Sequence, residues 1–589
     1  MCSSKIRNVA VIAHVDHGKT TLVDQLFRQS GMFRENQAVV ERMMDSMDLE
    51  RERGITIAAK NGALRYRGHT INIIDTPGHA DFGGQVERVL QMADGALLLV
   101  DAQEGPMPQT FFVLKKALAL RLPVIVVVNK IDKPAARPNW AVDQVFDLFV
   151  KLDAPHEILD FHVLYASAIA GYAGEDPAQP GTDMQPLFDA IIKYIPAPSG
   201  DAHGPLQMRV STIDHSPFLG RLGIGKITSG SMRVGMPVAV ADSAGQLRLT
   251  RITKIYHFDC TRKVEVDSAG LGEIVAVAGQ DDLTVGETFT DPEDPRPLPA
   301  PPIDPPTVSM FFLPNNSPFA GLEGEFVTST HLAERLRREA LVDVALVVEE
   351  LPGSPGFKVS GRGELHLSVI IEKMRREGYE FQVSCPRVIF KEEAGRRLEP
   401  YEELLVEMAE EHSGTVIEKL GARKGQLLEM RSENGLMRMR YRIPTRGLLG
   451  FKTEFMSDVK GMGVLTYVFL EYGAFAGEMR QRRNGVLVST ENCTTVAYAL
   501  FNLQKRGRLF LEPGVRIYRG QIIGEHCRDN DLMVNPSKGK HLTNVRAAGS
   551  DENIILTPVV QMSLEDCITY INDDELVEIT PQNIRLRKR

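Results

Sequence analysis

The first 195 residues alternate short apolar runs with segments whose apolar positions recur at helical spacing. The apolar runs cover residues 8–13, 70–75, 95–101, 123–129 and 161–167, and the helical segments cover residues 20–28, 85–92, 109–120, 143–152 and 184–195. Strands that are apolar throughout and separated by helices are typical of a parallel sheet covered on both faces. The pattern therefore predicts a doubly wound α/β domain over residues 1–197.

The pattern changes after Pro196. Short β-rich pieces at residues 222–229, 236–241, 248–256 and 274–278, separated by turns that contain glycine, predict a small antiparallel β-barrel domain over residues 202–290. The proline-rich stretch 291–306 comes next. Because proline lacks an N–H group and fixes φ, we expect neither helix nor strand there, but a semi-rigid spacer.

After the spacer, one order of elements occurs twice. The first pass predicts strands at 307–312, 342–349, 356–360 and 380–386 and helices at 330–341 and 365–377. The second pass runs through 401–410, 413–420, 425–432, 436–443, 446–459 and 463–471. The order βαββαβ predicts two ferredoxin-like α+β domains, at 303–390 and 398–478, followed by a β-rich C-terminal domain at 479–589.

Composition narrows the class of protein. The 589 residues exceed what one core supports, and 43% hydrophobic with 25% charged residues is ordinary for a soluble protein. No apolar run approaches the roughly 20 residues of a membrane span, so we expect a cytoplasmic protein without a membrane partner. The six cysteines are scattered singly, which favours reduced thiols over disulfides or zinc. A net charge of −9 argues against non-specific coating of nucleic acid but leaves local basic patches open.

The stretch Ala13-His-Val-Asp-His-Gly-Lys-Thr20 links the first predicted strand to the first predicted helix. Such a loop directs backbone N–H groups and the helix dipole at an anion, with Lys19 placed for the β- and γ-phosphates and the Thr20 hydroxyl for Mg²⁺. Ala13 replaces the glycine of the general pattern, a change that a negative φ tolerates. The residues predicted to bind the nucleotide here are Asp16, His17, Gly18, Lys19, Thr20 and Thr21.

Three further motifs follow strands of the same domain. Asp75 ends the second predicted strand and can hold Mg²⁺ through water, while the Gly78 N–H can touch a γ-phosphate. Asp132, in Asn129-Lys130-Ile-Asp132, can accept hydrogen bonds from guanine N1 and N2, a donor pair that adenine lacks, so guanine is predicted. Ser167 and Ala168 follow the last long strand and offer N–H groups to the guanine O6. All lie at carboxyl ends of strands, where such sheets bind ligands.

Together these motifs resemble the translational GTPase family. Arg53-Gly-Ile-Thr-Ile57 lies where that family has its first switch, which implies that Thr56 is a Mg²⁺ ligand. His79 follows Gly78 where the family carries a histidine that orients the attacking water, and the resemblance implies an apolar gate of Val15 and Ile55. Slow intrinsic GTP hydrolysis that a ribosome accelerates is the implied activity.

The C-terminal half narrows the resemblance. Only residues 385–400 separate the two ferredoxin-like repeats, too few for the translocating domain that elongation factor G carries there. The stretches 497–508, 528–535 and 541–547, with the terminal 584–589, resemble the domain distinctive of the BipA/TypA type. The resemblance then covers the whole chain.

A basic stretch near the C-terminus contains Lys538, Lys540, His541 and Arg546. In the family a loop here reaches ribosomal and transfer RNA, and phosphate contacts would make the affinity depend on salt. A solvated loop without a partner is the alternative, because runs of charge are often no more than that. The run Arg480-Gln-Arg-Arg483 is interpreted as a solvated linker.

The resemblance implies a monomeric GTPase that hydrolyses GTP to GDP and phosphate with Mg²⁺ and acts in large-subunit assembly or in translation under stress. Its expected partners are the ribosome (70S and large subunit), rRNA and tRNA. An alternative is an RNA-binding assembly scaffold that GTP stabilises and hydrolysis only releases. A metabolic kinase fits poorly, since Asn129 to Asp132 specify guanine.

Overall fold

The structure is a computed structural model that describes residues 3–14, 16–31, 48–53, 56, 59–77, 83–179, 181–216, 220–242, 245–280, 282–299, 305–343, 345–393, 395–433, 435–479, 484–539 and 555–589. The chain forms two compact units, Met1–Asp304 with Leu341–Val344, and Pro305–Ala340 with Ala345–Arg589. The predicted division into five domains is finer than this grouping and stays a prediction. Among the described residues, no helix has the length and apolar character needed to cross a bilayer.

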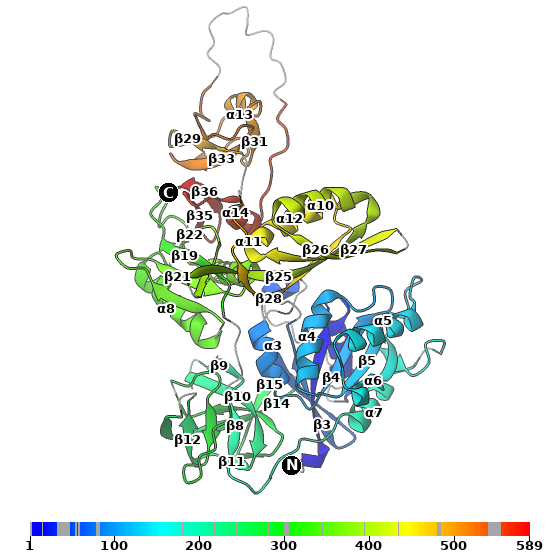
Figure 1. The fold of residues 1–589 in the computed structure, drawn as a ribbon. Coiled ribbons are helices and arrows are strands. Elements are labelled where there is room, and N and C mark those ends of the chain that lie inside the picture. The colour runs from blue at the N-terminus through cyan, green and yellow to red at the C-terminus, as the bar shows by residue number, and fades with distance from the viewer. Residues whose placement is uncertain are drawn as a thin grey trace, which may run out of the picture. The chain divides into compact units, whose positions relative to one another are not determined.

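The first unit begins with a seven-stranded sheet of order β2-β3-β1-β4-β5-β6-β7 (Figure 1). Its strands are β1 Ile6–Ala13, β2 Lys60–Tyr66, β3 His69–Asp75, β4 Gly95–Asp101, β5 Val124–Asn129, β6 His162–Ser167 and β7 Tyr172–Gly174. The five central strands are parallel, as predicted. The edge strands β2 and β7 run antiparallel and were not predicted, because their mixed polar sequences lack the continuous apolar run of a central strand.

Helices cover both faces of this sheet. They are α1 Lys19–Gln29, α2 Asp48–Arg53, α3 Gly83–Leu90, α4 Pro108–Ala119, α5 Pro138–Lys151, α6 His156–Leu159 and α7 Gln185–Tyr194. The apolar faces of α1 and α7 share one core with the odd-numbered side chains of β1, β3, β4 and β5. Figure 1 shows α3, α4 and α5 grouped on the other face. The doubly wound prediction is confirmed.

An antiparallel β domain follows, also as predicted. Its strands are β8 Gln207–Arg209, β9 Thr212–Ser216, β10 Gly220–Ser229, β11 Ser231–Arg233, β12 Pro237–Ala241, β13 Leu247–Arg251, β14 Lys254–Asp259, β15 Arg262–Val266, β16 Ser268–Gly270, β17 Ile274–Ala278 and β18 Thr288–Thr290. Nine of them form one sheet around a single apolar core. The predicted strand 248–256 is two strands, because β13 pairs with β12 whereas β14 pairs with β15 and β17.

The barrel contacts the edge of the seven-stranded sheet through its β14–β15 hairpin. Cys260, at the tip of the hairpin, exchanges two backbone hydrogen bonds with Ala63 of β2, of 2.8 and 3.0 Å. Behind this contact, Asp94 accepts hydrogen bonds from Asn8 (2.7 Å) and from Lys226 of the barrel (2.9 Å). Backbone pairing and a charged hydrogen bond therefore join the two domains within the first unit.

The proline-rich segment forms neither helix nor strand in its described residues. Its first half, however, is bonded to the barrel: Leu298 N donates to Thr288 Oγ1 (3.1 Å), and Arg209 Nη1 donates to the Pro299 carbonyl (2.8 Å). Residues up to 299 are therefore an extension of the barrel rather than the free spacer that the composition predicts.

The second unit opens with the predicted βαββαβ order. Its elements are β19 Val308–Pro314, α8 Ser329–Val342, β20 Val347–Glu350, β21 Phe357–Gly361, α9 Glu364–Arg376 and β22 Phe381–Val383. The strands pair antiparallel in the order β20-β21-β19-β22, the ferredoxin-like arrangement. The strand predicted from residue 342 begins at Val347, because α8 continues through Val342.

The same order recurs in the second repeat. Its elements are β24 Lys391–Glu393, β25 Arg396–Ala409, α10 Ser413–Ala422, β26 Gln426–Glu433, β27 Leu436–Pro444, α11 Thr445–Leu448, α12 Phe451–Asp458 and β28 Val464–Ala474. β25 lies between β27 and β28, and α10 and α12 share a core with one face of the sheet. Two ferredoxin-like units are confirmed.

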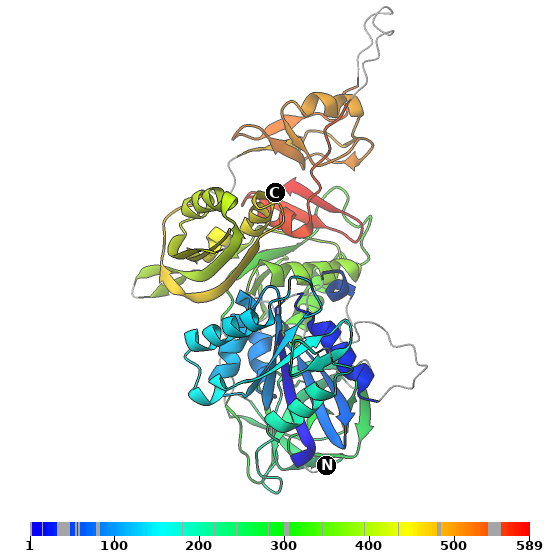
Figure 2. The ribbon, with the colours of Figure 1, turned by 90° about the vertical axis from the view of Figure 1, so that its right-hand side faces the viewer.

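The C-terminal region is β-rich, and most of its strands belong to the sheet of the first ferredoxin-like repeat. Its principal elements are β29 Val486–Ser489, α13 Ala497–Leu503, β31 Gly507–Leu509, β33 Gln521–His526, β34 Leu532–Val534, α14 Leu564–Tyr570, β35 Glu575–Ile579 and β36 Ile584–Lys588. Strand β35 pairs with β22, so the sheet of the first ferredoxin-like repeat continues through β36 and β33 (red hairpin, Figure 2). Glu578 of β35 is fully buried and accepts hydrogen bonds from Asn315, Ser317 and Tyr518.

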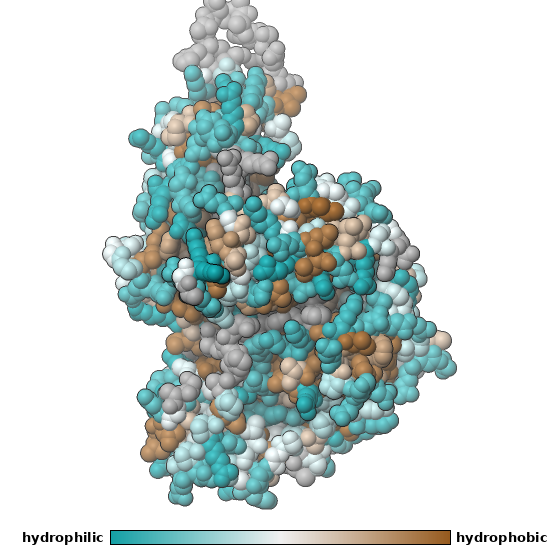
Figure 3. Space-filling view, viewed as in Figure 1, coloured by the Kyte–Doolittle hydropathy of each residue, from teal (hydrophilic) through white to brown (hydrophobic). Residues whose placement is uncertain are grey.

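Hydrophilic residues cover most of the face drawn in Figure 3, and the apolar residues lie in separate spots among them. Single exposed apolar side chains are usual on proteins that face water.

Candidate nucleotide site

The phosphate loop predicted from the sequence lies between β1, which ends at Ala13, and α1, which begins at Lys19. Gly18 has φ +93°, a conformation that L side chains rarely adopt. A Cβ atom there would also lie 2.5 Å from the Asn129 side-chain nitrogen. Glycine at this position is therefore required both by the backbone conformation and by the close approach of Asn129.

Asn129 joins three of the predicted loops. Its Nδ2 donates to the His17 carbonyl (2.8 Å), and its Oδ1 accepts from the Ala168 N–H (3.0 Å). The neighbouring Lys130 donates to the carbonyl of Asp16. The side chains of the Asn129 motif are thus bonded to the phosphate loop, and one of them also to the Ser167–Ala168 loop, so residues far apart in sequence lie together at one edge of the sheet.

The opposite side of the loop is charged. Lys19 is almost fully buried, and its Nζ lies 3.0 Å from Asp75 Oδ1 and donates to the Thr76 carbonyl. The Thr76 hydroxyl in turn donates to the carbonyl of Val11 on β1 (2.8 Å). Thr20 and Thr21 are half-buried in the first turn of α1. A cation, two hydroxyls and a carboxylate therefore gather where the phosphates are predicted.

The carboxylate of this group suits a hard divalent cation. Asp75 Oδ1 is buried and receives no hydrogen bond from the described parts of the chain, although the Lys19 ammonium is close to it. An oxygen in that state can accept from a metal-bound water, and hydroxyl and carboxylate oxygens are the ligands that Mg²⁺ prefers. Thr20 and Asp75 thus fit the predicted Mg²⁺, and Thr56 is buried as well.

The base-binding residues are placed differently from the expectation. Asp132 is exposed to solvent, so a bound guanine would itself have to shield the carboxylate from water. Ser167 is fully buried, and its hydroxyl accepts from the Ala170 N–H (3.2 Å). Because the Ala168 N–H already donates to Asn129, the guanine O6 would have to share that proton.

Asp101 belongs to this site and was missed from the sequence. It ends β4 beside Asn129 in the strand register, and its carboxylate is fully buried. It accepts from the Gln103 N–H (2.7 Å) and pairs with Lys130 (2.9 Å) and Lys133 (3.2 Å). Burial by itself would raise the pKa of Asp101, but the hydrogen bonds from Lys130 and Gln103 outweigh it and lower that pKa. The sequence feature that could have identified Asp101 is its position as a carboxylate at the end of an apolar strand.

Replacing Asp101 with asparagine is expected to reduce the free energy of unfolding at pH 7 by about 1–2 kcal/mol, since both lysines are partly exposed. Because the folded pKa is lowered, the contribution is complete above the ordinary value of about 3.9 and disappears as the pH falls through the folded pKa. Urea unfolding of wild type and variant at pH 7 and below pH 4 measures this. The exposed Asp147 on α5, changed to asparagine, is the control, and an equal loss at both pH values would contradict the ion-pair explanation.

Several predicted site residues lie outside the described residues: Val15, Ile55, Gly78, His79, Lys540, His541, Arg546 and the run Arg480 to Arg483. Of the predicted RNA contacts, Lys538 is described and is exposed. Their predicted roles stay predictions.

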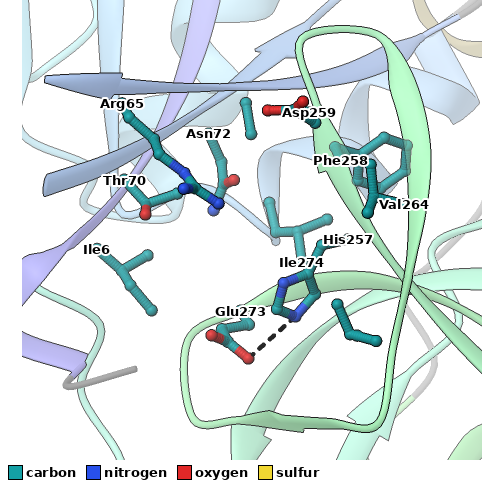
Figure 4. Close-up of a pocket in the computed structure, with 12 residues that line it drawn as sticks. Ile6, Arg65, Thr70, Asn72, His257, Phe258, Asp259, Val264, Glu273 and Ile274 are labelled. Carbon is teal, nitrogen blue, oxygen red and sulfur yellow. Dashed lines mark ion pairs between the residues drawn. The ribbon is translucent and has the colours of Figure 1, made fainter.

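A hollow of about 130 Å³ lies between the seven-stranded sheet and the barrel (Figure 4). Arg65 and Asn72 line it from β2 and β3, and His257 and Glu273 line it from the barrel, where His257 Nε2 is 3.3 Å from Glu273 Oε2. Ile6, at the start of β1, also borders it, whereas the nucleotide loops follow the carboxyl ends of the strands. The hollow is therefore separate from the nucleotide site.

A P-loop on a doubly wound sheet, an Asn-Lys-x-Asp motif bonded to it, a β-barrel and two ferredoxin-like repeats define a translational GTPase. Family models agree: residues 4–197 match the elongation factor Tu GTP binding domain, 220–290 elongation factor Tu domain 2, 396–483 the elongation factor G C-terminus and 484–589 the TypA/BipA C-terminal domain. The chain belongs to the BipA/TypA family, as its sequence resemblance predicts.

The relatives that support this assignment match nearly end to end. The chain is 52% identical over 587 residues to the large ribosomal subunit assembly factor BipA of Escherichia coli K12, covering 99% of this chain and 97% of that protein. It is 51% identical over 586 residues to the protein of the same name from Bacillus subtilis 168, covering 99% and 96%. A crystal structure of a protein from Thermus thermophilus shares the fold with a TM-score of 0.57 and 19% identity, covering 80% of this chain and 98% of that one.

Proposed function

We propose that this protein is a ribosome-dependent GTP hydrolase that acts in assembly of the large ribosomal subunit. The observation that carries the proposal is the bonding of Asn129 to both His17 and Ala168, which gathers the guanine and phosphate loops into one site. The ribosomal partner comes from the relatives, which are named as large-subunit assembly factors.

In this proposal the phosphate loop holds the β- and γ-phosphates through the backbone N–H groups of residues 16–20, and Lys19 leaves Asp75 to contact them. Thr20, Thr56 and, through water, Asp75 would hold Mg²⁺, which supplies charge neutralisation at the phosphates. Gly78 donates its N–H to the γ-phosphate. His79 orients the water that attacks the γ-phosphorus, so that GDP leaves and inorganic phosphate forms.

GTP hydrolysis depends mainly on positioning the attacking water and on neutralising charge at the phosphates. A site in which the group that orients the water is not in position hydrolyses GTP slowly until a partner moves that group into position. We infer that the ribosome provides it by moving His79 past Val15 and Ile55. Lys538, Lys540, His541 and Arg546 are proposed to contact the phosphates of rRNA or tRNA, which would make ribosome binding weaken as salt increases.

Two measurements test the proposal. Co-sedimentation with 70S ribosomes and large subunits, at two salt concentrations and with a GTP analogue, GDP or no nucleotide, should show binding that is strongest with the analogue and weaker at high salt. Phosphate release should be faster with ribosomes than without them. Equal rates would contradict the proposal. A variant that binds GTP without hydrolysing it, yet supports large-subunit maturation fully, would favour the scaffold function instead.

Changing Asp132 to asparagine tests the guanine site. We expect GTP affinity to fall roughly 30-fold, since a carboxylate that accepts from two base N–H groups is worth about 2 kcal/mol more than an amide that matches one. Xanthosine triphosphate, which carries a carbonyl where guanine has its amino group, should bind the variant better than GTP does. Titration calorimetry with both nucleotides measures this, and unchanged GTP affinity would remove Asp132 from the site.

A further inference from the structure

A buried ion pair lies close to the predicted metal site and has no part in the mechanism above. Glu50 of α2 is fully buried, and its carboxylate is hydrogen-bonded to the ammonium of Lys60, whose side chain is 16% exposed. A carboxylate is removed from water at a large cost unless it is paired and hydrogen-bonded. Glu50 and Lys60 are therefore expected to hold α2 and the start of β2 together.

The ion pair lies beside the predicted metal site in the strand register. Lys60 is the first residue of β2, and in the antiparallel ladder it lies directly opposite Asp75, the carboxylate predicted to hold Mg²⁺. Directly opposite residues in such a ladder have Cα atoms about 5 Å apart. The Lys60 backbone is thus fixed beside the metal carboxylate, while its side chain reaches Glu50.

The segment between the paired residues contains Thr56. It leaves α2 at Arg53 and enters β2 at Lys60, so Thr56 is four positions before Lys60 along the chain, and four steps span at most about 14 Å. Thr56 is itself buried, with 7% of its surface exposed. Holding the two ends of the segment together limits the positions that Thr56 can occupy relative to Asp75.

We infer that the Glu50–Lys60 ion pair is a positioning device that directs Thr56 to the Mg²⁺ and γ-phosphate of GTP and so sets the preference for GTP over GDP. The inference rests on the proposed function, in which Thr56 is a metal ligand. In this inference Glu50 and Lys60 are positioning residues that act through Thr56. Breaking the pair therefore reduces binding that depends on the γ-phosphate and leaves GDP binding unchanged.

The test compares E50Q and K60M with wild type by titration calorimetry, using a non-hydrolysable GTP analogue and GDP in the presence of Mg²⁺. We expect the affinity for the analogue to fall about 10-fold, within the usual range of coupling between sites, and GDP affinity to stay within about twofold. K60R, which keeps the charge, should retain the wild-type preference. R51Q is the matched control, because Arg51 lies on the same helix but forms an exposed pair with Asp48 at 3.7 Å.

An equal fall in affinity for both nucleotides, or no change in either, would overturn the inference, since the first indicates a structural role and the second no role. If E50Q fails to fold, judged by circular dichroism, K60M and K60R give the answer. T56V, measured alongside, distinguishes failure of the proposed role of Thr56 from failure of the ion-pair inference. If T56V keeps the GTP preference, the proposed role of Thr56 fails; if T56V loses it but E50Q and K60M do not, only the ion-pair inference fails.

Discussion

Replacing Gly18 with alanine should raise the dissociation constants of both GTP and GDP roughly 30-fold or more. A side chain at φ +93° costs about 1–2 kcal/mol, and the new Cβ would lie 2.5 Å from Asn129 Nδ2. Moving Asn129 away breaks its buried hydrogen bonds to His17 and Ala168, at about 1–3 kcal/mol. The expected loss follows from these two terms at about 1.4 kcal/mol per factor of ten. Titration calorimetry with each nucleotide measures it.

Gly31 is the matched control for this change. It also has a positive φ, +78°, but no atom of the residues that the structure describes lies within 4 Å of its Cβ position. Alanine there should cost a similar backbone strain and leave nucleotide affinity unchanged. If both variants lose affinity equally, the effect comes from general destabilisation, and the close approach of Asn129 to the phosphate loop is not its cause.

Changing His79 to alanine should reduce the ribosome-stimulated rate of GTP hydrolysis by about 10²- to 10⁴-fold and leave GTP binding intact. A positioned side chain that orients or activates the attacking water contributes a factor of that size. Multiple-turnover phosphate release with saturating ribosomes measures the rate, and calorimetry measures binding.

The exposed His156 on α6 provides the control for His79, since its replacement by alanine should change neither quantity. Loss of GTP binding in the His79 variant would reassign that residue to the structure of the loop. A normal stimulated rate would show that another group orients the water, and the proposed mechanism would need a different residue at that step.

The central strands of the GTPase domain were predictable because each is a continuous apolar run, as in Val124 to Val128, and such runs are buried on both faces. The edge strand Lys60–Tyr66 has polar residues at both ends and one buried stretch between them, so it does not differ from a loop in sequence. Only its hydrogen bonding to β3 in the folded sheet identifies this segment as a strand.

The nucleotide motifs were recognisable for a similar reason. Asp75 and Asn129 end predicted strands and Lys19 lies in the loop after one, and the carboxyl ends of parallel strands meet at one edge. Asp101 also ends a strand at this edge of the sheet, but no recognisable motif surrounds it in the sequence. Its role became clear from its ion pairs with Lys130 and Lys133, which lie in the loop after β5.

By itself the sequence determined the local choices: the periodicity of helices and strands, the glycine of the phosphate loop and the order in which the repeats follow one another. These features depend on neighbours within a few residues, so the sequence pattern alone indicates them. Tertiary structure alone decided three things: the pairing of β35 with β22, the contact of Cys260 with Ala63, and the burial of Glu50 against Lys60. Each of these contacts joins residues from separate elements. Backbone N–H and C=O groups must be hydrogen-bonded and a buried charge must be paired, but neither requirement produces a periodic pattern in the sequence that would identify the partner.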